Sequence, residues 1–231
     1  MDFETWAPYY RAILKDMGFS EKEDETAAAF IAGRKCAAAR NAAEMLEKRI
    51  KDRPALVCGN APCLLRDIRK IAEKNGGALP ADTTVIAADG AAVVLEACGI
   101  VPDIIVTDLD GRASSDPEAE IRLANAHPEL LMLVHAHGDN KHRLEKYLPL
   151  LNTFIATCQC RPPASHVFNF GGFSDGDRCL FLADAFGASE IGFAGFDFED
   201  EGVTPVKKKK LEWAKKLIDE RRRENPRIGI I

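Results

Sequence analysis

Two aspartates, Asp108 and Asp110, follow the apolar stretch IIVT (104–107) and precede Gly111. At the end of a β-strand, side chains two positions apart share a face, so both carboxylates can reach one cation. Magnesium suits such a site because it takes one or two carboxylates together with waters and substrate phosphates. The alternative is that the two aspartates cap a turn, and their spacing alone leaves both interpretations open.

A third carboxylate, Asp89, follows the apolar stretch VIAA (85–88) and precedes Gly90. Aspartate is a good helix N-cap, worth about 1 kcal/mol, so a structural role is a sound alternative. Like charges about 4 Å apart repel by about 1 kcal/mol in water and about 4 kcal/mol at an effective dielectric constant of 20. Three acids at one edge of a sheet are therefore costly unless a cation neutralises them, which favours the metal interpretation.

The segment HAHGDN (135–140) ends another apolar stretch. Its two histidines, His135 and His137, would share a face of a strand, which could indicate a zinc or iron hydrolase. In such hydrolases the pair is expected on the first strand of a barrel, whereas here it ends a middle strand. Histidines held by hydrogen bonds are therefore the simpler interpretation. Asp139 and Asn140 follow where the strand passes into a helix, and they either cap that helix or hold a metal or a ribose.

The segment NFGGFSDGDR (169–178) is too polar and too rich in glycine for a simple connection. Its glycines allow close approach of the backbone to a ligand. Arg178 either binds a phosphate in a bidentate fork or pairs with a neighbouring aspartate. The candidate residues of this segment are Gly171, Gly172, Phe173, Asp175, Asp177 and Arg178.

Two weaker signals concern anions. The segment GNAPCL (59–64) is neither a P-loop nor a dinucleotide fingerprint, but it offers free N–H groups at a predicted helix N-terminus. Four lysines, Lys207 to Lys210, open another predicted helix and oppose its macrodipole. Solvated lysines are the simpler interpretation, and a docked anion would make their position favourable.

Seven apolar stretches alternate with helical segments. The predicted strands are 55–59, 83–88, 103–108, 130–138, 154–158, 166–170 and 190–196. The predicted helices are 61–77, 89–99, 116–126, 139–151, 175–187 and 207–224. Continuous apolar strands are typical of burial on both faces, so the fold class is α/β, with a doubly wound, mostly parallel sheet. Apart from the lysine run, the polar segments follow predicted strands, where open α/β sheets bind ligands.

The first 50 residues are predicted to be helical, with a capping-box pattern at Ser20 and Glu23. We therefore expect an N-terminal helical module, 1–52, followed by a catalytic domain, 53–231. The net charge of −5 comes without a basic stripe, so a nucleic-acid partner is not expected. No signal peptide and no apolar run of about 20 residues is present, and the seven cysteines form no CxxC. A reduced cytoplasmic protein without a membrane segment is the prediction.

The chain resembles the archaeal 6-hydroxymethyl-7,8-dihydropterin pyrophosphokinases of methanopterin biosynthesis over about residues 54–220. The resemblance lies in DGA, PDIIVTDLDG, HAHGDN, NFGGFSDGDR and KKKKLEWAKKLI, which are specific in combination. That family is similar in turn to thiamine pyrophosphokinases. Those enzymes usually carry a β-rich C-terminal domain and an RxDH segment, whereas this chain lacks that domain and has FSDGDR, which counts against thiamine.

The resemblance implies a thiamine pyrophosphokinase-like catalytic domain that uses ATP and Mg²⁺. The implied reaction transfers a diphosphoryl group from ATP to the hydroxymethyl oxygen of the pterin and releases AMP. The implied catalytic residues are Asp89, Asp108, Asp110 and Asp139, with the first three as metal ligands. The chemistry also needs an acceptor for the hydroxyl proton, for which Asp110 and Asp139 are the candidates. The residues implied to bind ATP or pterin are Gly59, Asn60, Pro62, Gly90, Asn140, Gly171, Gly172, Phe173, Asp175, Asp177, Arg178 and Lys210.

Other functions remain compatible with the same residues. A related diphosphokinase or DxD-type transferase could act on thiamine or a sugar, and a non-catalytic module could bind a nucleotide. Intact acids in every motif disfavour the non-catalytic module. A homodimer is compatible with the likeness to thiamine pyrophosphokinases.

Overall fold

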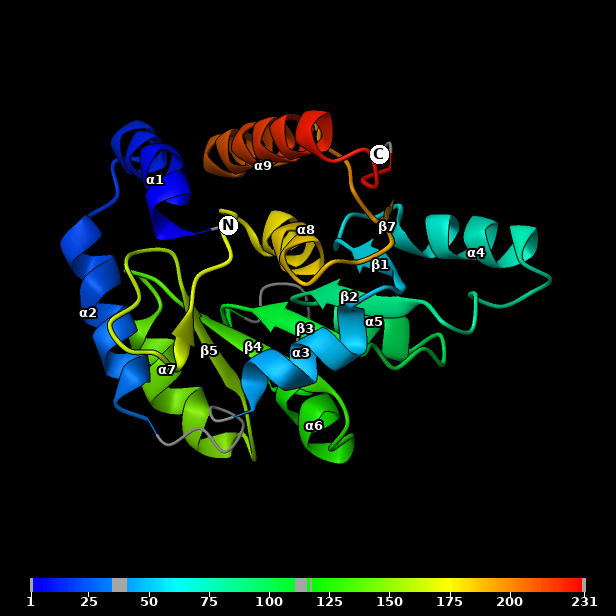
Figure 1. Ribbon diagram of the computed structural model, residues 1–231, viewed down its shortest axis with the longest axis horizontal. Helices are drawn as coiled ribbons and strands as arrows, with labels where there is room; N and C mark the ends of the chain where they lie inside the picture. The colour runs from blue at the N-terminus through cyan, green and yellow to red at the C-terminus, as the bar shows by residue number, and fades with distance from the viewer. Residues whose placement is uncertain (1, 35–40, 111–115, 117, 230–231) are drawn as a thin grey trace.

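Seven parallel strands form one sheet in the described part of the computed structural model, which covers residues 2–34, 41–110, 116 and 118–229 (Figure 1). Their order across the sheet is β6-β5-β4-β3-β2-β1-β7. Their bounds are β1 Pro54–Cys58, β2 Thr84–Ala88, β3 Ile104–Thr107, β4 Leu131–Ala136, β5 Ile155–Cys158, β6 Val167–Phe168 and β7 Glu190–Ala194. The predicted fold class, a doubly wound parallel α/β sheet, is confirmed.

Helices cover both faces of this sheet. Their bounds are α1 Phe3–Met17, α2 Glu21–Ala32, α3 Ala42–Ile50, α4 Leu64–Lys74, α5 Ala91–Glu96, α6 Ala119–Ala126, α7 Lys141–Tyr147, α8 Asp175–Ala185 and α9 Pro205–Glu224, with a 3₁₀ turn, η1, at Leu148–Leu150. Among these described helices, none is both long enough and apolar enough to cross a membrane.

Two hydrophobic cores lie on opposite faces of the sheet, because successive strand residues point to opposite sides. Leu56, Ile105 and Met132 belong to the first core, which also contains residues of α2 and α4 to α7. Val57 and Ile104 belong to the second core, beneath α3 and α8. Burial on both faces explains why the strands are continuous apolar runs in the sequence.

Helix α8 reverses the direction of winding. From β1 to β6 the chain moves steadily toward one edge of the sheet, and α8 then returns across β1, β2 and β3 to place β7 beside β1. Helix α9 packs on α8, and Figure 1 shows it on the side of α8 away from the sheet. The strands are parallel, so all strand-end segments meet at one edge, near the N-terminus of α8.

The predicted N-terminal helical module contains three helices in its described residues. Trp6 of α1 and Ile31 of α2 are buried in the first core, and Leu46 of α3 is buried in the second. Ser20 caps α2 as expected, since its side chain accepts a hydrogen bond from the backbone N–H of Glu23. The division of the chain at residue 52 stays a prediction, although these helices share both cores with the sheet.

Several predicted elements are shorter in the structure than in the sequence analysis. The helix predicted at 61–77 is Leu64–Lys74, and the strand predicted at 166–170 is Val167–Phe168. At most of the ends that differ, a glycine or proline terminates the helix or strand, whereas the predicted element extends to this residue or close to it.

Candidate active site

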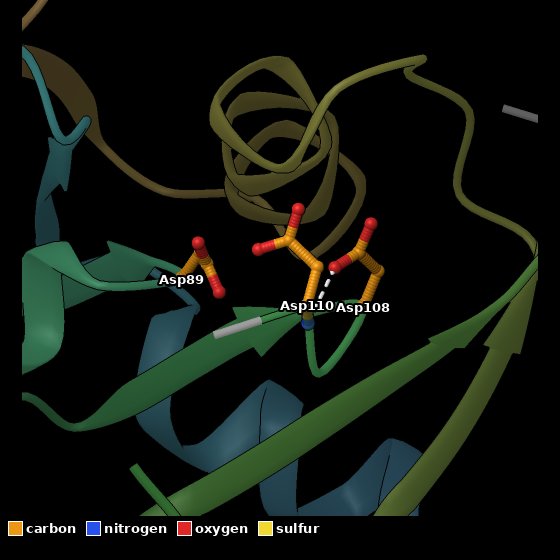
Figure 2. Close-up of side chains that lie close together, drawn as sticks. All are labelled: Asp89, Asp108 and Asp110. Atoms are coloured by element: carbon orange, nitrogen blue, oxygen red, sulfur yellow. Dashed lines mark hydrogen bonds between the residues drawn. The ribbon is translucent and has the colours of Figure 1, made fainter. Parts of the chain in front are cut away.

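Three aspartates gather at the carboxyl ends of β2 and β3. One carboxylate oxygen from each of Asp89, Asp108 and Asp110 lies within 4.8 Å of the other two. Figure 2 shows the three side chains next to one another, with Asp89 on one strand end and the other two on the neighbouring one. The structure therefore brings together the three residues that the sequence predicted as metal ligands.

A left-handed turn at Leu109 places Asp108 and Asp110 on the same side. Leu109 has a φ of 61° and is buried in the first core. Its N–H donates to Oγ1 of Thr107 at 2.9 Å, and the N–H of Asp110 donates to Oδ1 of Asp108 at 2.9 Å, as drawn in Figure 2. Strand β3 ends at Thr107, so this turn, and not the alternation of an extended strand, makes the two carboxylates neighbours.

Asp89 adopts a left-handed backbone conformation, with a φ of 45°, which is uncommon for a residue other than glycine and typical of functional sites. Its Oδ1 accepts a hydrogen bond from Oγ1 of Thr107 at 3.2 Å. Burial raises the pKa of Asp89, and the charges of Asp110 and Asp108 raise it further. Without a cation, burial and the neighbouring carboxylates therefore disfavour the charged form of Asp89.

Glu120 of α6 is a buried fourth carboxyl at the same place, only 7% exposed. Its carboxyl group lies near Thr107 and Asp89. Burial and the charge of Asp89 raise its pKa well above the usual range. Burial and the neighbouring Asp89 therefore both disfavour a negative charge on Glu120.

His137 links the cluster to Asp139. Its Nε2 lies 3.0 Å from Oδ2 of Asp108, and its Nδ1 lies 2.8 Å from Oδ1 of Asp139. Burial lowers the pKa of His137, but the two carboxylates outweigh burial and raise the pKa to about 8. Burial likewise raises the pKa of Asp108, but the hydrogen bond and charge of His137 bring it below its usual value. At neutral pH the three side chains form an ionised chain, with Asp139 exposed at its outer end.

Asn140 ties the ends of β3 and β4 together. Its side-chain NH₂ donates to the carbonyls of Asp108 and His135 at 2.9 and 2.7 Å, and its Oδ1 accepts from the N–H of His137 at 3.0 Å. The side chain is fully buried. These contacts assign Asn140 a positioning role, and its predicted contact with ATP stays a prediction.

The N-terminus of α8 faces the acid cluster through Asp175. Burial and the charge of Asp108 raise the pKa of Asp175 to about 7, even though Arg178 lies 3.0 Å away and opposes the shift. Asp177 is fully buried and accepts hydrogen bonds from the N–H groups of Phe173 and Ser174 at 2.6 and 2.7 Å. Asp177 therefore shapes the loop, and its predicted place in a ligand pocket stays a prediction.

Two glycines precede α8 in a left-handed conformation, with φ of 92° at Gly171 and 89° at Gly172. A Cβ atom on Gly172 would lie 2.8 Å from the backbone nitrogen of Arg178. Phe173 follows them and is buried. Close packing of this loop on the first turn of α8 accounts for the second glycine, so a role in ligand approach stays a prediction.

The predicted anion loop after β1 is closed against β7. A Cβ atom on Gly59 would lie 2.6 Å from the carbonyl oxygen of Gly195, and the N–H of Gly59 donates to Ala194. Asn60 and Pro62 are exposed beside it. The glycine therefore serves strand packing, and nucleotide contacts by Gly59, Asn60 and Pro62 stay predictions. Gly90, at the start of the short helix α5, supplies a backbone hydrogen bond to Asp89.

The lysine run of α9 divides into two parts. Lys207 and Lys208 are exposed, as expected of solvated lysines. Lys209 pairs with Asp16 of α1 at 2.9 Å, and Lys210 lies over the ring of Phe173, 5.8 Å from its centroid. Lys210 also influences a strand-end acid, since its charge contributes to the low pKa of Asp139.

The zinc alternative finds little support in the described residues. His135 is 2% exposed, with Nδ1 3.1 Å from Oγ1 of Thr157. Burial and the charge of Arg178 lower its pKa well below the usual range. Among the described His, Cys, Asp and Glu residues, the three-aspartate cluster is the one group of three that could hold a metal.

Three residues of this edge escaped the sequence analysis. Gln159 follows β5 and bonds with Arg178, so the rule that polar residues follow strands could have found it. Glu120 and Arg143 lie on helices amid other charged residues, and no local signal distinguishes them. The charge of Arg143 lowers the pKa of both Asp108 and Asp139, which places a cation near that side of the cluster.

Three archaeal proteins of the same name are similar to this chain over most of its length. The chain is 38% identical to the 6-hydroxymethyl-7,8-dihydropterin pyrophosphokinase of Methanothermobacter thermautotrophicus, over 95% of this chain and 94% of that protein. It is 37% identical to the protein of the same name from Pyrococcus furiosus, with the same coverage, and 33% identical to that from Methanocaldococcus jannaschii, over 95% of each chain. Among solved structures, the MAf glycosyltransferase of Magnetospirillum magneticum AMB-1 aligns with a TM-score of 0.42 and 17% identity over 72% of this chain and 29% of its own.

The sequence also matches, over residues 33–202, the family described as 6-hydroxymethylpterin diphosphokinase MptE-like. That range contains the aspartate cluster, the His137 turn and the loop before α8. The resemblance drawn from the motifs is confirmed, and the chain belongs to the MptE-like 6-hydroxymethylpterin diphosphokinase family.

Proposed function

We propose that this protein transfers a diphosphoryl group from ATP to the hydroxymethyl oxygen of 6-hydroxymethyl-7,8-dihydropterin and releases AMP. The relatives that cover 95% of the chain bear the name of this activity. The single observation that carries the proposal is the cluster of Asp89, Asp108 and Asp110 at the carboxyl edge of the sheet. The cluster and the polyphosphate of ATP are both negatively charged, so the cluster can bind ATP only through a divalent cation that contacts both.

The donor set fits Mg²⁺. Carboxylate oxygens are its preferred protein ligands, and the mutual repulsion of three acids within 4.8 Å is relieved by a cation. Asp89, Asp108 and Asp110 would hold the ion, which when bound neutralises negative charge on the phosphates. The raised pKa of Asp89 supports this assignment, because it marks a place where the protein alone cannot accommodate all the charge.

Three cationic side chains lie close enough to Asp108 or Asp139 to lower the pKa of these acids. The charges of Arg143 and Arg178 act on Asp108, and those of Arg143 and Lys210 act on Asp139. In our proposal these side chains bind the phosphate oxygens that the metal leaves exposed. Phosphoryl transfer depends chiefly on such positioning and charge stabilisation, with little covalent participation by the protein.

The reaction breaks the bond between the β-phosphorus of ATP and the oxygen that bridges it to the α-phosphorus. AMP leaves with that oxygen and its electron pair. The hydroxymethyl oxygen forms the new bond to the β-phosphorus and loses its proton.

Asp175 is proposed to receive that proton. Its pKa of about 7 suits a group that exchanges protons near neutral pH. Asp139, one of the two acceptors predicted from the sequence, is less suitable, because the hydrogen bond from His137 holds its pKa well below the usual value. Asp110, the other, stays a prediction.

The test is to identify the nucleotide product. Purified protein, MgATP and 6-hydroxymethyl-7,8-dihydropterin are expected to yield AMP and the pterin diphosphate in equal amounts, separated by ion-exchange chromatography. Parallel reactions contain thiamine or a sugar as acceptor. Formation of ADP, or AMP that depends on thiamine or the sugar but not on the pterin, would overturn the proposal.

A further inference from the structure

A buried carboxylate of the N-terminal helices, Asp24, reaches the same edge of the sheet. Asp24 lies in the first turn of α2 and is 2% exposed. It stands outside the family match, which begins at residue 33. A buried carboxylate is costly unless hydrogen bonds satisfy it, so its partners indicate what it is for.

Three groups donate to the carboxylate of Asp24. The hydroxyl of Tyr10 and the side-chain NH₂ of Gln159 donate to Oδ2, each at 2.8 Å, and the N–H of Gly138 donates to Oδ1 at 2.7 Å. Tyr10 belongs to α1. Gly138 lies two residues after β4, and Gln159 directly follows β5, so two of the three bonds hold strand ends of the candidate active site.

The bond to Gln159 also fixes the direction of its amide. With its NH₂ on Asp24, Gln159 presents Oε1 to a guanidinium nitrogen of Arg178 at 3.1 Å. Turning the amide over would place its oxygen against the carboxylate and its NH₂ against the guanidinium, and both contacts would be repulsive. By orienting this amide, Asp24 determines that Gln159 offers Arg178 a hydrogen-bond acceptor and not a donor.

Arg178 is held on two sides and keeps one donor for another group. One of its terminal nitrogens contacts Asp175 at 3.0 Å and the other contacts Gln159. Its Nε is buried and has no hydrogen-bond partner within the described part of the chain, and the residue as a whole is only 8% exposed. Buried donors are rarely left without an acceptor, so the orientation of this guanidinium decides which further group can accept a hydrogen bond from Nε.

The bond to Gly138 fixes the turn that carries His137 and Asp139. A Cβ atom on Gly138 would lie 2.8 Å from Cβ of Glu23, so the turn and the first turn of α2 are in direct contact. The two residues beside Gly138 are those that extend the ionised chain from Asp108. Displacement of α2 would therefore move this chain as well as Arg178.

We propose that Asp24 is a positioning residue for diphosphoryl transfer, which makes α2 a working part of the active site. It acts through Gln159 on Arg178 and through Gly138 on the His137 turn, and it does not itself contact the substrates. This inference rests on the proposed function, since its main measurement is the turnover of ATP with the pterin.

The central experiment exchanges the acid and the amide. Asp24→Asn replaces one accepting oxygen by an NH₂ group, which faces the NH₂ of Gln159 in one orientation of the new amide and the N–H of Gly138 in the other. We expect kcat to fall about 10- to 100-fold, the scale of loss typical of small misplacements. Adding Gln159→Glu restores one acid and one amide in the reverse order, since the new carboxylate accepts from both Arg178 and the new amide. The double variant is expected to recover kcat to within about threefold of wild type, whereas Gln159→Glu alone faces Asp24 with a second carboxylate and is impaired.

Tyr10→Phe is the matched control. It removes a hydrogen bond to the same carboxylate and leaves Gln159 and Gly138 in place. A loss of thermal stability with unchanged kcat is expected. Circular dichroism and the melting temperature of every variant separate misfolded protein from misaligned protein.

Gln159→Leu keeps the inference testable if Asp24→Asn does not fold. It cuts the link to Arg178 without changing α2, and a reduced kcat is expected. Wild-type kcat in folded Asp24→Asn or in Gln159→Leu would overturn the inference, as would a double variant no better than the single ones. If the wild-type protein itself forms no AMP with the pterin, the proposed function fails, and the role of Asp24 fails with it.

Discussion

At the scale of single residues, a balance of charge defines the candidate site. Burial raises the pKa of Asp89 and of Glu120 on one side of the cluster, whereas Asp108, His137 and Asp139 form an ionised chain on the other. The protein by itself therefore disfavours charge on the first side and pairs it with His137 on the second. A cation that binds here is expected to lower the pKa of Asp89.

Asp108→Asn tests the metal assignment. The variant removes a ligand charge and the acceptor of His137, so we expect kcat to fall by about 10²- to 10³-fold, comparable to removal of one strong electrostatic contact. The increase in melting temperature caused by Mg²⁺ should also disappear.

Asp103→Asn is the control, because Asp103 lies at the opposite end of β3, where it bonds with Arg49 at 2.8 Å and Val85 at 2.9 Å. It is expected to lose about 1 kcal/mol of stability and keep its activity. Full activity or an undiminished response to Mg²⁺ in Asp108→Asn would contradict the assignment.

His137→Gln tests the ionised chain through pH. The folded pKa of about 8 lies above the ordinary value of 6.5, so the stabilisation is fully present below about pH 6.5 and is lost as pH rises through about 8. In metal-free protein the free energy of unfolding of wild type should exceed that of the variant by up to about 2 kcal/mol more at pH 6 than at pH 9. Urea unfolding at the two pH values measures this difference, and an equal difference at pH 6 and pH 9 would contradict the ionised chain.

At the scale of elements, the loop before α8 decides where that helix begins. Gly171 and Gly172 turn the chain after β6, and Asp177 caps the helix by accepting from Phe173 and Ser174. This loop places Asp175 and Arg178 against acids supplied by β2 and β3.

Gly172→Ala is expected to disturb both the fold and the site. Its φ of 89° is unfavourable for alanine, and the added Cβ would meet the backbone of Arg178 at 2.8 Å. We expect a loss of about 2–4 kcal/mol in the free energy of unfolding. Activity should fall by about 10²-fold.

The matched change is Gly187→Ala at the other end of α8, where φ is 74° and no atom lies within 4 Å of the added Cβ. It should cost only about 1 kcal/mol and leave kcat unchanged. Chemical denaturation and initial rates on both variants provide the comparison, and equal effects would show that the close packing at Gly172 is unimportant.

At the scale of the whole molecule, the N-terminal helices are joined to the sheet by buried contacts. Trp6 is 1% exposed, donates from Nε1 to the carbonyl of Gln159 at 2.9 Å, and packs its ring edge-to-face with Phe181 of α8 at 6.3 Å. One residue of α1 thus contacts both the end of β5 and the crossover helix.

Trp6→Ala should therefore destabilise the whole protein, by about 3–5 kcal/mol. A single cooperative unfolding transition, followed by both fluorescence and circular dichroism, is expected at a lower midpoint. Val206→Ala, at a position 58% exposed, should change stability by no more than about 0.5 kcal/mol. Loss of α1 alone, with the main transition unchanged, would instead support the independent module predicted for residues 1–52.

Much of this protein follows from its sequence. Apolar runs of strand length that alternate with helices predict a parallel sheet, because only strands covered on both faces lack polar alternation. In such a sheet all strand ends lie at one edge, so the aspartates after β2 and β3 had to be near one another. The family could also be identified, since its motifs are the strand-end segments themselves.

Other features depend on contacts that no local pattern encodes. Gln159 and Asp24 bond across a separation of 135 residues, and Glu120 reaches Asp89 from a helix on another part of the chain. Even the pairing of Asp108 with Asp110 depends on Leu109, which enters the core in a left-handed turn. Hydrophobic periodicity and turn preferences are local and can be detected in the sequence, whereas buried polar partners are selected by the packing of distant elements, which only the tertiary structure determines.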